Sequence, residues 1–164
     1  MELGEPITSI KGIGPRRAEA LGKLGLFSLR DLLYFAPREY QDFSAATPIC
    51  AAAHGALAAL HVLLVSEPKH VHIRRGMEIT TVRALGFGAD PADKAAQVSL
   101  VWYNQPYRAR SLATGQEWYA AGRMDRSRGA KLVNPSLHAE LPGIVPVYPV
   151  SYTHLRAHET EADL

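Results

Sequence analysis

The sequence lacks the residues and segments that several common classes of binding site and of protein require. Cys50 is the only cysteine among 164 residues, which excludes an intrachain disulfide and a zinc site made of thiolates. No run of apolar residues approaches the length of a membrane-spanning helix, and the N-terminus lacks the charged-then-apolar pattern of a signal peptide. No internal repeat or low-complexity tract occurs. These absences favour a globular protein in a reducing, cytoplasmic setting.

Motifs that carry catalysis are also absent. The sequence contains no Gly-x-x-x-x-Gly-Lys-Ser/Thr loop to cradle nucleotide phosphates and no acidic box for magnesium. No Ser/His/Asp or Cys/His arrangement can be recognised, and no pair of carboxylates stands out. His70 and His72 alternate on one face of a strand, but the sequence indicates no third metal ligand beside them. We therefore expect no catalytic residue, no metal and no cofactor in this chain.

The net charge of the chain is small, but its middle region has an excess of positive charge. The formal net charge is only +2. Residues 51–140 contain eleven Lys and Arg against seven Asp and Glu, whereas residues 1–50 contain six of each kind. Such an excess is a modest electrostatic footprint for phosphate binding, although a solvated surface can look similar.

The first fifty residues have the pattern of a helical module. Gly12 and Gly14 suit a tight turn, and Pro15 follows at the first position of a helix, where its missing N–H costs nothing. Ser28 is suited to cap a second helix, which Pro37 ends. The spacing of the two glycines is typical of a helix-hairpin-helix motif.

In a helix-hairpin-helix motif the backbone N–H groups of the hairpin and the following helix N-terminus form a cradle for a DNA phosphate. Here that cradle would contain Gly12 and Gly14, with positive charge added by Arg16 and Arg17. The alternative is that the two short helices only pack against a neighbour and the glycines serve the turn alone.

Beyond residue 57 the hydrophobic pattern takes the period of strands. The sequence predicts strands over residues 60–65, 78–85, 97–103, 117–125 and 131–134, with a short helix within 106–113. Five strands with a helix between the third and fourth are the layout of an OB-fold, a small Greek-key barrel that binds oligonucleotides on one face. We therefore predict a mainly β chain, in which a five-stranded OB-fold-like Greek-key barrel follows a helix-hairpin-helix-like pair.

The most informative segment is Trp102–Tyr107, which ends the third predicted strand with two aromatic residues, breaks it with Asn-Gln-Pro and presents a third aromatic residue. Each base stacked on an aromatic ring is worth roughly 1–3 kcal/mol, and phosphates need cations nearby. Because neighbours on a strand point to opposite faces, Trp102 should lie in the core if Tyr103 faces DNA. The candidate phosphate ligands are the arginines that follow in the sequence, namely Arg108, Arg110, Arg123 and Arg126.

Four blocks of the sequence, in order over residues 7–150, resemble the N-terminal region of the RecG family of ATP-dependent DNA helicases. The blocks are Ile10–Pro15, Asp31–Tyr40, Leu100–Tyr107 and Gly143–Pro149. The resemblance implies that the barrel is a wedge domain, which binds branched DNA at stalled forks or Holliday junctions. It also implies that Tyr103 and Tyr107 cap the terminal base pair while the strands part to either side. Without the resemblance, packing of the barrel is the favoured interpretation of these two tyrosines.

The resemblance also predicts how the chain is divided. We expect a helical module at 1–50, the wedge at 51–140, a connector at 141–150 toward a helicase motor beyond the point of truncation, and a non-native tail at 151–164. ATP and Mg²⁺ are expected only for that motor. The implied partners are branched DNA and, in a full-length protein, the motor domains in cis, with no membrane partner. The implied state is a monomer in the bacterial cytoplasm, associated with the nucleoid.

The chain departs from the family's pattern between the second and third predicted strands. Residues 86–94 form a longer loop than usual and lack the Asp-Gly-Thr-Gly type of turn. Two other functions also stay open. A general single-strand-binding OB module would not prefer forks to plain single strands. A protein-docking domain, with the aromatic residues as interface anchors, would show no salt-sensitive DNA binding.

Overall fold

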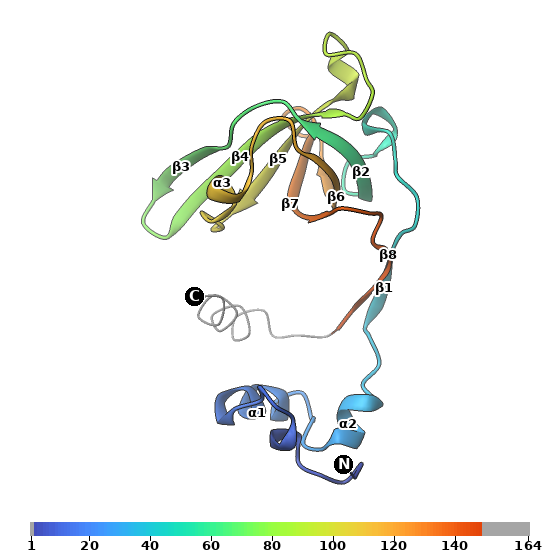
Figure 1. Ribbon diagram of the computed structural model, residues 1–164, viewed down its shortest axis with the longest axis vertical. Coiled ribbons are helices and arrows are strands. Elements are labelled where there is room, and N and C mark those ends of the chain that lie inside the picture. The colour runs from blue at the N-terminus through green and yellow to red at the C-terminus, as the bar shows by residue number, and fades with distance from the viewer. Residues whose placement is uncertain (1, 149–164) are drawn as a thin grey trace. The chain divides into compact units, whose positions relative to one another are not determined.

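The computed structural model describes residues 2–148, which fall into two units (Figure 1). The larger unit is Gln41–Val145, and the smaller one contains the chain before it and the chain from Pro146. The sequence analysis placed these boundaries at 50/51 and 140/141 instead. The predicted connector is described as far as residue 148, and the predicted tail at 151–164 lies outside the described residues.

The boundaries between the two units fall within two short strands that pair with each other. These strands are β1 (Glu39–Phe43) and β8 (Gly143–Val147), which form a separate two-stranded sheet. Neither strand is predicted from the sequence. Each has only five residues, and Pro146 within β8 argues against a strand because proline donates no hydrogen bond to a ladder. Their pairing depends on bringing together two segments that are far apart in the sequence.

Five strands of the larger unit close into a barrel. They are β2 (Leu57–Leu64), β4 (Met77–Gly86), β5 (Gln97–Tyr103), β6 (Glu117–Asp125) and β7 (Lys131–His138). Their order is β2-β6-β7-β5-β4, and β2 pairs with β4 to complete the circle. Of these pairings only that of β5 with β7 is parallel. With α3 (Arg108–Ser111) between β5 and β6, the predicted OB-like Greek-key barrel is confirmed.

Alternate residues along the strands fill the barrel. On β5, Val98, Leu100 and Trp102 belong to the buried core, whereas Tyr103 is exposed. The other strands add Leu60, Val62, Leu64, Val82, Ala84, Ala120, Met124 and Leu132. Burial of each large aliphatic or aromatic side chain contributes about 1.5–3 kcal/mol, so this set drives the barrel to form. The opposite faces of the same strands point away from the core.

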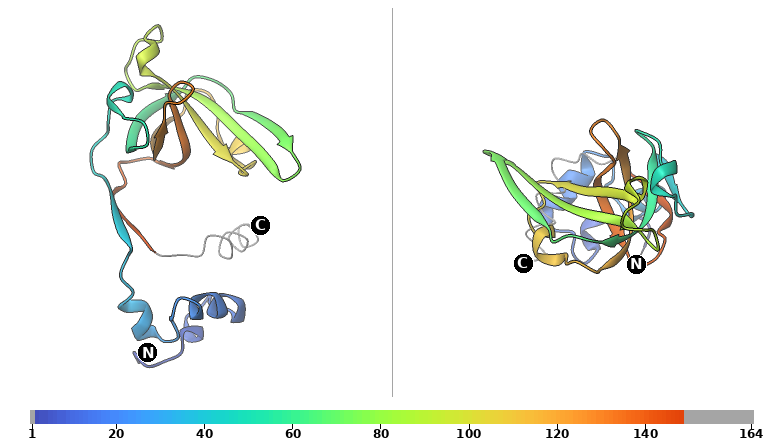
Figure 2. Two further views of the ribbon diagram at one scale, coloured as in Figure 1. Left: turned by 180° about the vertical axis from the view of Figure 1, so that it is seen from behind. Right: turned by 90° about the horizontal axis from the view of Figure 1, so that it is seen from above.

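A further strand, β3 (Lys69–Arg74), pairs with the first part of β4 and extends the sheet beyond the barrel (Figures 1 and 2). All six of its residues are exposed, so the segment has no buried face on which a sequence prediction could rest. At the other end of β4 the longer loop noted in the sequence contains a 3₁₀ turn, η3 (Lys94–Ala96). Another 3₁₀ turn, η2 (Ile49–Ala51), precedes β2.

The strand β7 is longer than predicted, because it continues through Pro135 to His138. Proline in a sheet is tolerated at an irregularity in the ladder. The register between β6 and β7 shifts between Ala121 and Arg123, directly opposite this proline. Gly122 lies at the shift, and a Cβ atom added there would be 3.1 Å from the Cα atom of Pro135. The glycine therefore permits the two strands to approach closely at this point.

The smaller unit contains η1 (Ile7–Ser9), α1 (Pro15–Gly22) and α2 (Leu29–Leu33). As predicted, Pro15 begins α1 and Ser28 caps α2. The Asp31 N–H donates to Ser28 Oγ (3.3 Å) and the Ser28 N–H donates to Asp31 Oδ2 (2.9 Å), which is a capping box. The helix before the predicted hairpin is only a single 3₁₀ turn, and α2 ends four residues before Pro37.

Candidate nucleic-acid interface

The end of β5 directs its two aromatic residues to opposite sides. Trp102 is fully buried, and its Nε1–H donates to the carbonyl oxygen of Pro135 (2.8 Å). Tyr103 is 37% exposed. The alternation expected for neighbours on a strand is therefore present, with Trp102 in the core and Tyr103 on the outer face. A buried indole whose N–H is satisfied also fixes the position of the strand that carries Tyr103.

The backbone at Tyr103 and Asn104 is held by hydrogen bonds that involve two asparagines. The Asn104 N–H donates to the Glu78 carbonyl oxygen (2.8 Å), and Asn104 Oδ1 accepts the Glu78 N–H (3.0 Å). Asn134 Oδ1 accepts the Tyr103 N–H (2.9 Å). Asn104 and Asn134 both have positive φ values, 55° and 44°, which asparagine adopts more readily than most residues. These three bonds make the start of the Asn-Gln-Pro turn rigid.

Tyr107, at the other end of the turn, is 50% exposed and immediately precedes α3. Its hydroxyl donates to Gln105 Oε1 (2.9 Å). The guanidinium carbon of Arg108 lies 5.3 Å from the centroid of the Tyr107 ring and 5.6 Å from that of Trp102. Both distances suit a cation–π interaction. Arg108 thus supports the ring of Tyr107, and its Nε atom is buried without a hydrogen-bond partner among the described residues.

The structure gives different surroundings to the predicted phosphate ligands. Arg108 and Arg110 lie on α3, directly after Tyr107, and Arg110 is exposed. Arg123 Nη1 instead donates to the carbonyl oxygen of Gly55 (2.5 Å). Arg126 Nε donates to the carbonyl oxygen of Ala52 (2.6 Å) and its Nη2 donates to that of Ile49. Arg123 and Arg126 therefore hold the segment before β2 against the barrel.

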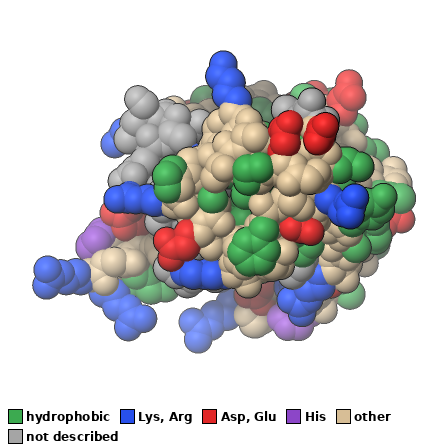
Figure 3. Space-filling view, turned by 90° about the horizontal axis from the view of Figure 1, so that it is seen from below, with side chains coloured by type: hydrophobic (Ala, Val, Ile, Leu, Met, Phe, Trp, Pro, Cys, Tyr) green, Lys and Arg blue, Asp and Glu red, His purple; other side chains and the backbone are tan. Residues whose placement is uncertain are grey.

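In the smaller unit, the predicted hairpin has the geometry of a tight turn. Gly12 has a φ of 96°, and Gly14 caps α1. Arg17 Nη1 donates to the carbonyl oxygen of Gly12 (2.8 Å), whereas Arg16 is exposed. On the molecular face that Figure 3 shows, Lys and Arg side chains occur among acidic and hydrophobic ones.

The sequence analysis missed the β3–β4 hairpin as part of this surface. Val71 on β3 is the cross-strand neighbour of Ile79 on β4, and Ile79 is the neighbour of Tyr103. Val71 is exposed. The hairpin also carries the basic residues Lys69, His70, His72, Arg74 and Arg75. The sequence analysis placed His70 and His72 on one face of a strand but did not count their segment among the five predicted strands.

Two features were searched for in residues 2–148 and are absent from them. Among these residues no group of three or more His, Cys, Asp or Glu side chains is placed to hold a metal ion. No helix in the same range is long and apolar enough to cross a bilayer.

These observations define the class of protein as an OB-like barrel with exposed aromatic and basic side chains beside one strand end. Comparison with known proteins then gives the family. A family model described as the RecG wedge domain matches residues 6–157, so the chain belongs to the RecG wedge domain family. The resemblance noted in the sequence is confirmed. The matched range ends inside the segment that the sequence analysis assigned to a separate tail.

Similar proteins include two that are each named ATP-dependent DNA helicase RecG. The one from Thermotoga maritima is 31% identical over 124 residues, which are 74% of this chain and 15% of that protein. The one from Streptococcus pneumoniae is 28% identical over 151 residues, 90% of this chain and 21% of that protein. A solved structure of RecG bound to a three-way DNA junction matches with a TM-score of 0.73 and 27% identity, covering 92% of this chain and 21% of that one. The chain covers between 15% and 21% of the length of these relatives.

Proposed function

We propose that this chain is the branched-DNA-binding wedge of a RecG-like helicase, and that it splits the strands of a fork. The observation that carries the proposal is the pair of exposed rings, Tyr103 and Tyr107, at the two ends of a rigid turn. A ring that is already fixed in place loses little conformational freedom when a base stacks on it. The solved RecG structure, which contains a three-way DNA junction, supports the same substrate class.

In this proposal Tyr103 and Tyr107 stack on the last base pair of the fork and the strands part around the turn. Arg108 keeps the Tyr107 ring in place through its cation–π contact. Arg110, which is exposed beside these rings, contacts a phosphate. The guanidinium groups of Arg123 and Arg126 already donate to carbonyl oxygens, so their contribution is to the barrel's shape first and to phosphate binding second.

The helical hairpin is a second proposed phosphate contact, through the backbone at Gly12 and Gly14 and through Arg16 and Arg17. This assignment rests on the positive φ of Gly12 and on Gly14 as the cap of α1. The alternative role as a packing module predicts that replacing both arginines leaves DNA binding unchanged.

For the whole protein we propose an ATP-dependent DNA helicase that acts in fork reversal, recombination and repair. The names of the relatives support this, because each is called an ATP-dependent DNA helicase. The motor domains, joined in cis, would hydrolyse ATP with Mg²⁺ and pull the duplex, while the wedge separates the strands. No step of ATP hydrolysis is assigned to residues of this chain. The proposed state is a monomer in the bacterial cytoplasm.

The test is binding of a fluorescently labelled fork to the full chain, measured by anisotropy over a series of salt concentrations. We expect the double variant Tyr103→Ala/Tyr107→Ala to lose at least about 30-fold in affinity, since each stacked base is worth roughly 1–3 kcal/mol. The control variant Tyr103→Phe/Tyr107→Phe keeps both rings and should keep most of the affinity. Linear duplex and single strand serve as competitors.

Three results would contradict the wedge. Equal affinity for a fork and for a single strand would favour a general OB-type single-strand binder. No salt-dependent DNA binding, even at low salt, would favour a protein-docking domain in which the tyrosines anchor a protein partner. Fork binding with undiminished affinity in the double alanine variant would show that the two rings do not contribute to binding.

A further inference from the structure

A pocket in the barrel unit lies between the loop after β4 and the segment before β2, and the function proposed above does not use it. Its volume is about 310 Å³. Residues 46–50 form one wall, residues within 86–96 form the other, and His61 on β2 completes the lining. The second wall belongs to the loop that is longer than usual for the family. The pocket therefore depends on a segment in which this chain differs from its family.

An exposed aromatic ring lines this pocket and is already held in place. The side chain of Phe87 is 53% exposed. Its ring stacks on His61, with centroids 4.3 Å apart and planes at 15°, and His61 stacks in the same way on Tyr119. His61 Nε2 in turn lies 2.6 Å from Glu117 Oε1. Because the stack covers one side of the Phe87 ring and the residue stays largely exposed, the other side of the ring is open to a ligand.

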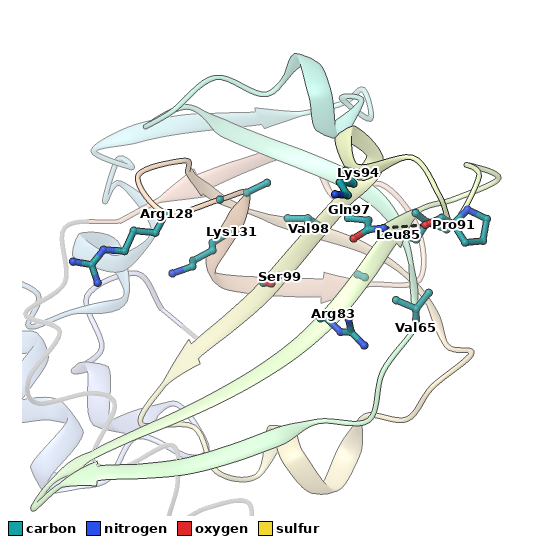
Figure 4. Close-up of a pocket in the computed structure, with 13 residues that line it drawn as sticks. Val65, Arg83, Leu85, Pro91, Lys94, Gln97, Val98, Ser99, Arg128 and Lys131 are labelled. Carbon is teal, nitrogen blue, oxygen red and sulfur yellow. Dashed lines mark hydrogen bonds between the residues drawn. The ribbon is translucent and has the colours of Figure 1, made fainter.

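The described residues that line the pocket include one carboxylate and no Lys or Arg. That carboxylate is Asp93, whose Oδ1 accepts the Ala95 N–H (2.9 Å) and which forms no ion pair within the described part of the chain. His61 adds no net positive charge in either protonation state, because it is paired with Glu117. Lys94 follows Asp93 in the sequence, but it lines a different groove, over β4, β5 and β7 (Figure 4). The pocket therefore favours a cation and disfavours a phosphate.

Hydrogen bonds to the rest of the barrel unit fix both walls of the pocket. Arg126 Nε donates to the carbonyl oxygen of Ala52 (2.6 Å) and its Nη2 donates to that of Ile49, which holds the segment before β2. Gln97 Nε2 donates to the carbonyl oxygen of Pro91 (2.9 Å), the dashed bond in Figure 4, which ties the loop after β4 to the start of β5. A pocket whose walls are already fixed loses little conformational freedom when a ligand enters.

An arginine side chain matches this combination of ring, carboxylate and apolar wall. Its guanidinium stacks on aromatic faces, binds a carboxylate through two N–H groups and is less strongly hydrated than the ammonium of lysine. Its aliphatic stem can lie along the apolar residues of the walls, among them Pro48 and Ala96. An apolar side chain would instead remove water from the Asp93 carboxylate without compensating it. A volume of about 310 Å³ is near the lower end for ligand pockets, about 300–1,000 Å³, and suits one large side chain.

We propose that this pocket binds an arginine side chain of a partner protein. The guanidinium lies on the open side of the Phe87 ring and donates to the Asp93 carboxylate, and the stem lies between the two walls. Because the loop at this pocket departs from the family's pattern, a separate protein is a better match than the motor domains that the family shares. The pocket does not include Tyr103 or Tyr107, so the interaction requires no DNA and neither proposal rests on the other.

The experiment titrates the peptide acetyl-Gly-Arg-Gly-amide into the isotopically labelled full chain and follows the backbone amide signals by NMR. We expect saturable shifts at Phe87, Asp93 and Ala95, with a dissociation constant of about 1–10 mM, since a single side chain makes few contacts. The matched peptide has citrulline in place of arginine, which keeps the shape and removes the charge. It should bind at least about five-fold more weakly, because it forms neither the cation–π contact nor the ion pair.

Two aspartates of the same loop provide a matched pair of variants. Asp93→Asn keeps an oxygen that can cap η3 but removes the charge, and it should weaken binding of the arginine peptide about four-fold. Asp90→Asn removes the same charge, but Asp90 does not line the pocket and its Oδ1 accepts the Ala92 N–H (2.8 Å), so binding should change less than about two-fold. Phe87→Leu should weaken binding about three-fold through loss of the ring. The amide spectrum of each variant shows whether it is folded.

The proposal is overturned if the citrulline peptide binds as tightly as the arginine peptide, or if Asp90→Asn weakens binding as much as Asp93→Asn. Shifts at the pocket that do not saturate would also contradict it. If the same amides shift when the unaltered chain alone is concentrated, the occupant is a second copy of the chain. If a longer protein that carries the motor domains no longer binds the peptide, the occupant lies in cis, and the assignment to a partner protein fails.

Discussion

Two asparagine side chains support the candidate interface at the level of single residues. Asn104 and Asn134 adopt backbone conformations with positive φ, where a side chain with a Cβ atom is strained by about 1–2 kcal/mol. Each compensates by accepting a backbone N–H group, from Glu78 and from Tyr103 respectively. The strain of the two asparagines is thus offset by the same hydrogen bonds that position Tyr103.

Substitutions at Asn134 separate the contribution of its hydrogen bond to stability from that of its backbone strain. Asn134→Gly removes the hydrogen bond to the Tyr103 N–H but tolerates the positive φ, and should lower the free energy of unfolding by about 1 kcal/mol. Asn134→Ala removes the bond and keeps a Cβ atom at a positive φ, so it should be less stable than the glycine variant by about 1 kcal/mol. Urea unfolding of the full chain measures both. Equal stability of the two variants would show that φ at this position carries no strain.

At the level of elements, α2 depends on its cap more than on its length. A helix of five residues is far below the length that is stable by itself in water. The capping box between Ser28 and Asp31 satisfies backbone donors at its first turn. The Asp31 carboxylate also accepts the N–H of Phe27 (2.9 Å). Hydrogen bonds from Phe27 and Ser28 together hold the pKa of Asp31 below its ordinary value of 3.8.

Removing the cap should lower the local stability of α2, and so should a fall in pH. Ser28→Ala is expected to cost about 1 kcal/mol of local stability. Because the pKa of Asp31 is lowered by folding, its stabilisation is complete above pH 3.8 and is lost as the pH falls through the lowered value. Amide hydrogen exchange in residues 28–34, compared between variants at each pH, measures both effects. Asp31→Asn is the control, since it abolishes this pH dependence.

At the level of the whole molecule, the barrel joins segments that are distant in the sequence. Leu57 at the start of β2 pairs with Arg123 on β6, and Ser99 on β5 pairs in parallel with Lys131 on β7. Such contacts form only after the cost of closing long loops has been met. The barrel therefore has the topology of proteins that fold slowly for their size.

We expect the barrel to refold in milliseconds to seconds, the range of small domains dominated by non-local strand pairing. Trp102 is a suitable probe because it is fully buried, and Trp118 is the only other tryptophan. Stopped-flow fluorescence of the Trp118→Phe variant would follow Trp102 alone. Refolding within microseconds would mean that local contacts dominate, contrary to the topology. The unaltered chain provides the reference rate.

The sequence by itself determined the features that depend on local pattern. Alternation along the strand put Trp102 and Tyr103 on opposite faces, and the structure has Trp102 in the core. Capping preferences placed Pro15 and Ser28 at helix starts. The five barrel strands follow from the same periodicity, because one face of each is buried. The strand β3 is not among the five predicted strands, since it buries no face.

Only the tertiary structure decided which side chains meet. It placed Arg108 against Tyr107, and it turned Arg126 toward carbonyl oxygens before β2. It also aligned Arg83 with Lys131 across Ser99. The physical reason is that periodicity fixes the face to which a side chain points, whereas its neighbours depend on strand register. Register is set by closure of the barrel, which involves pairings that no single segment contains.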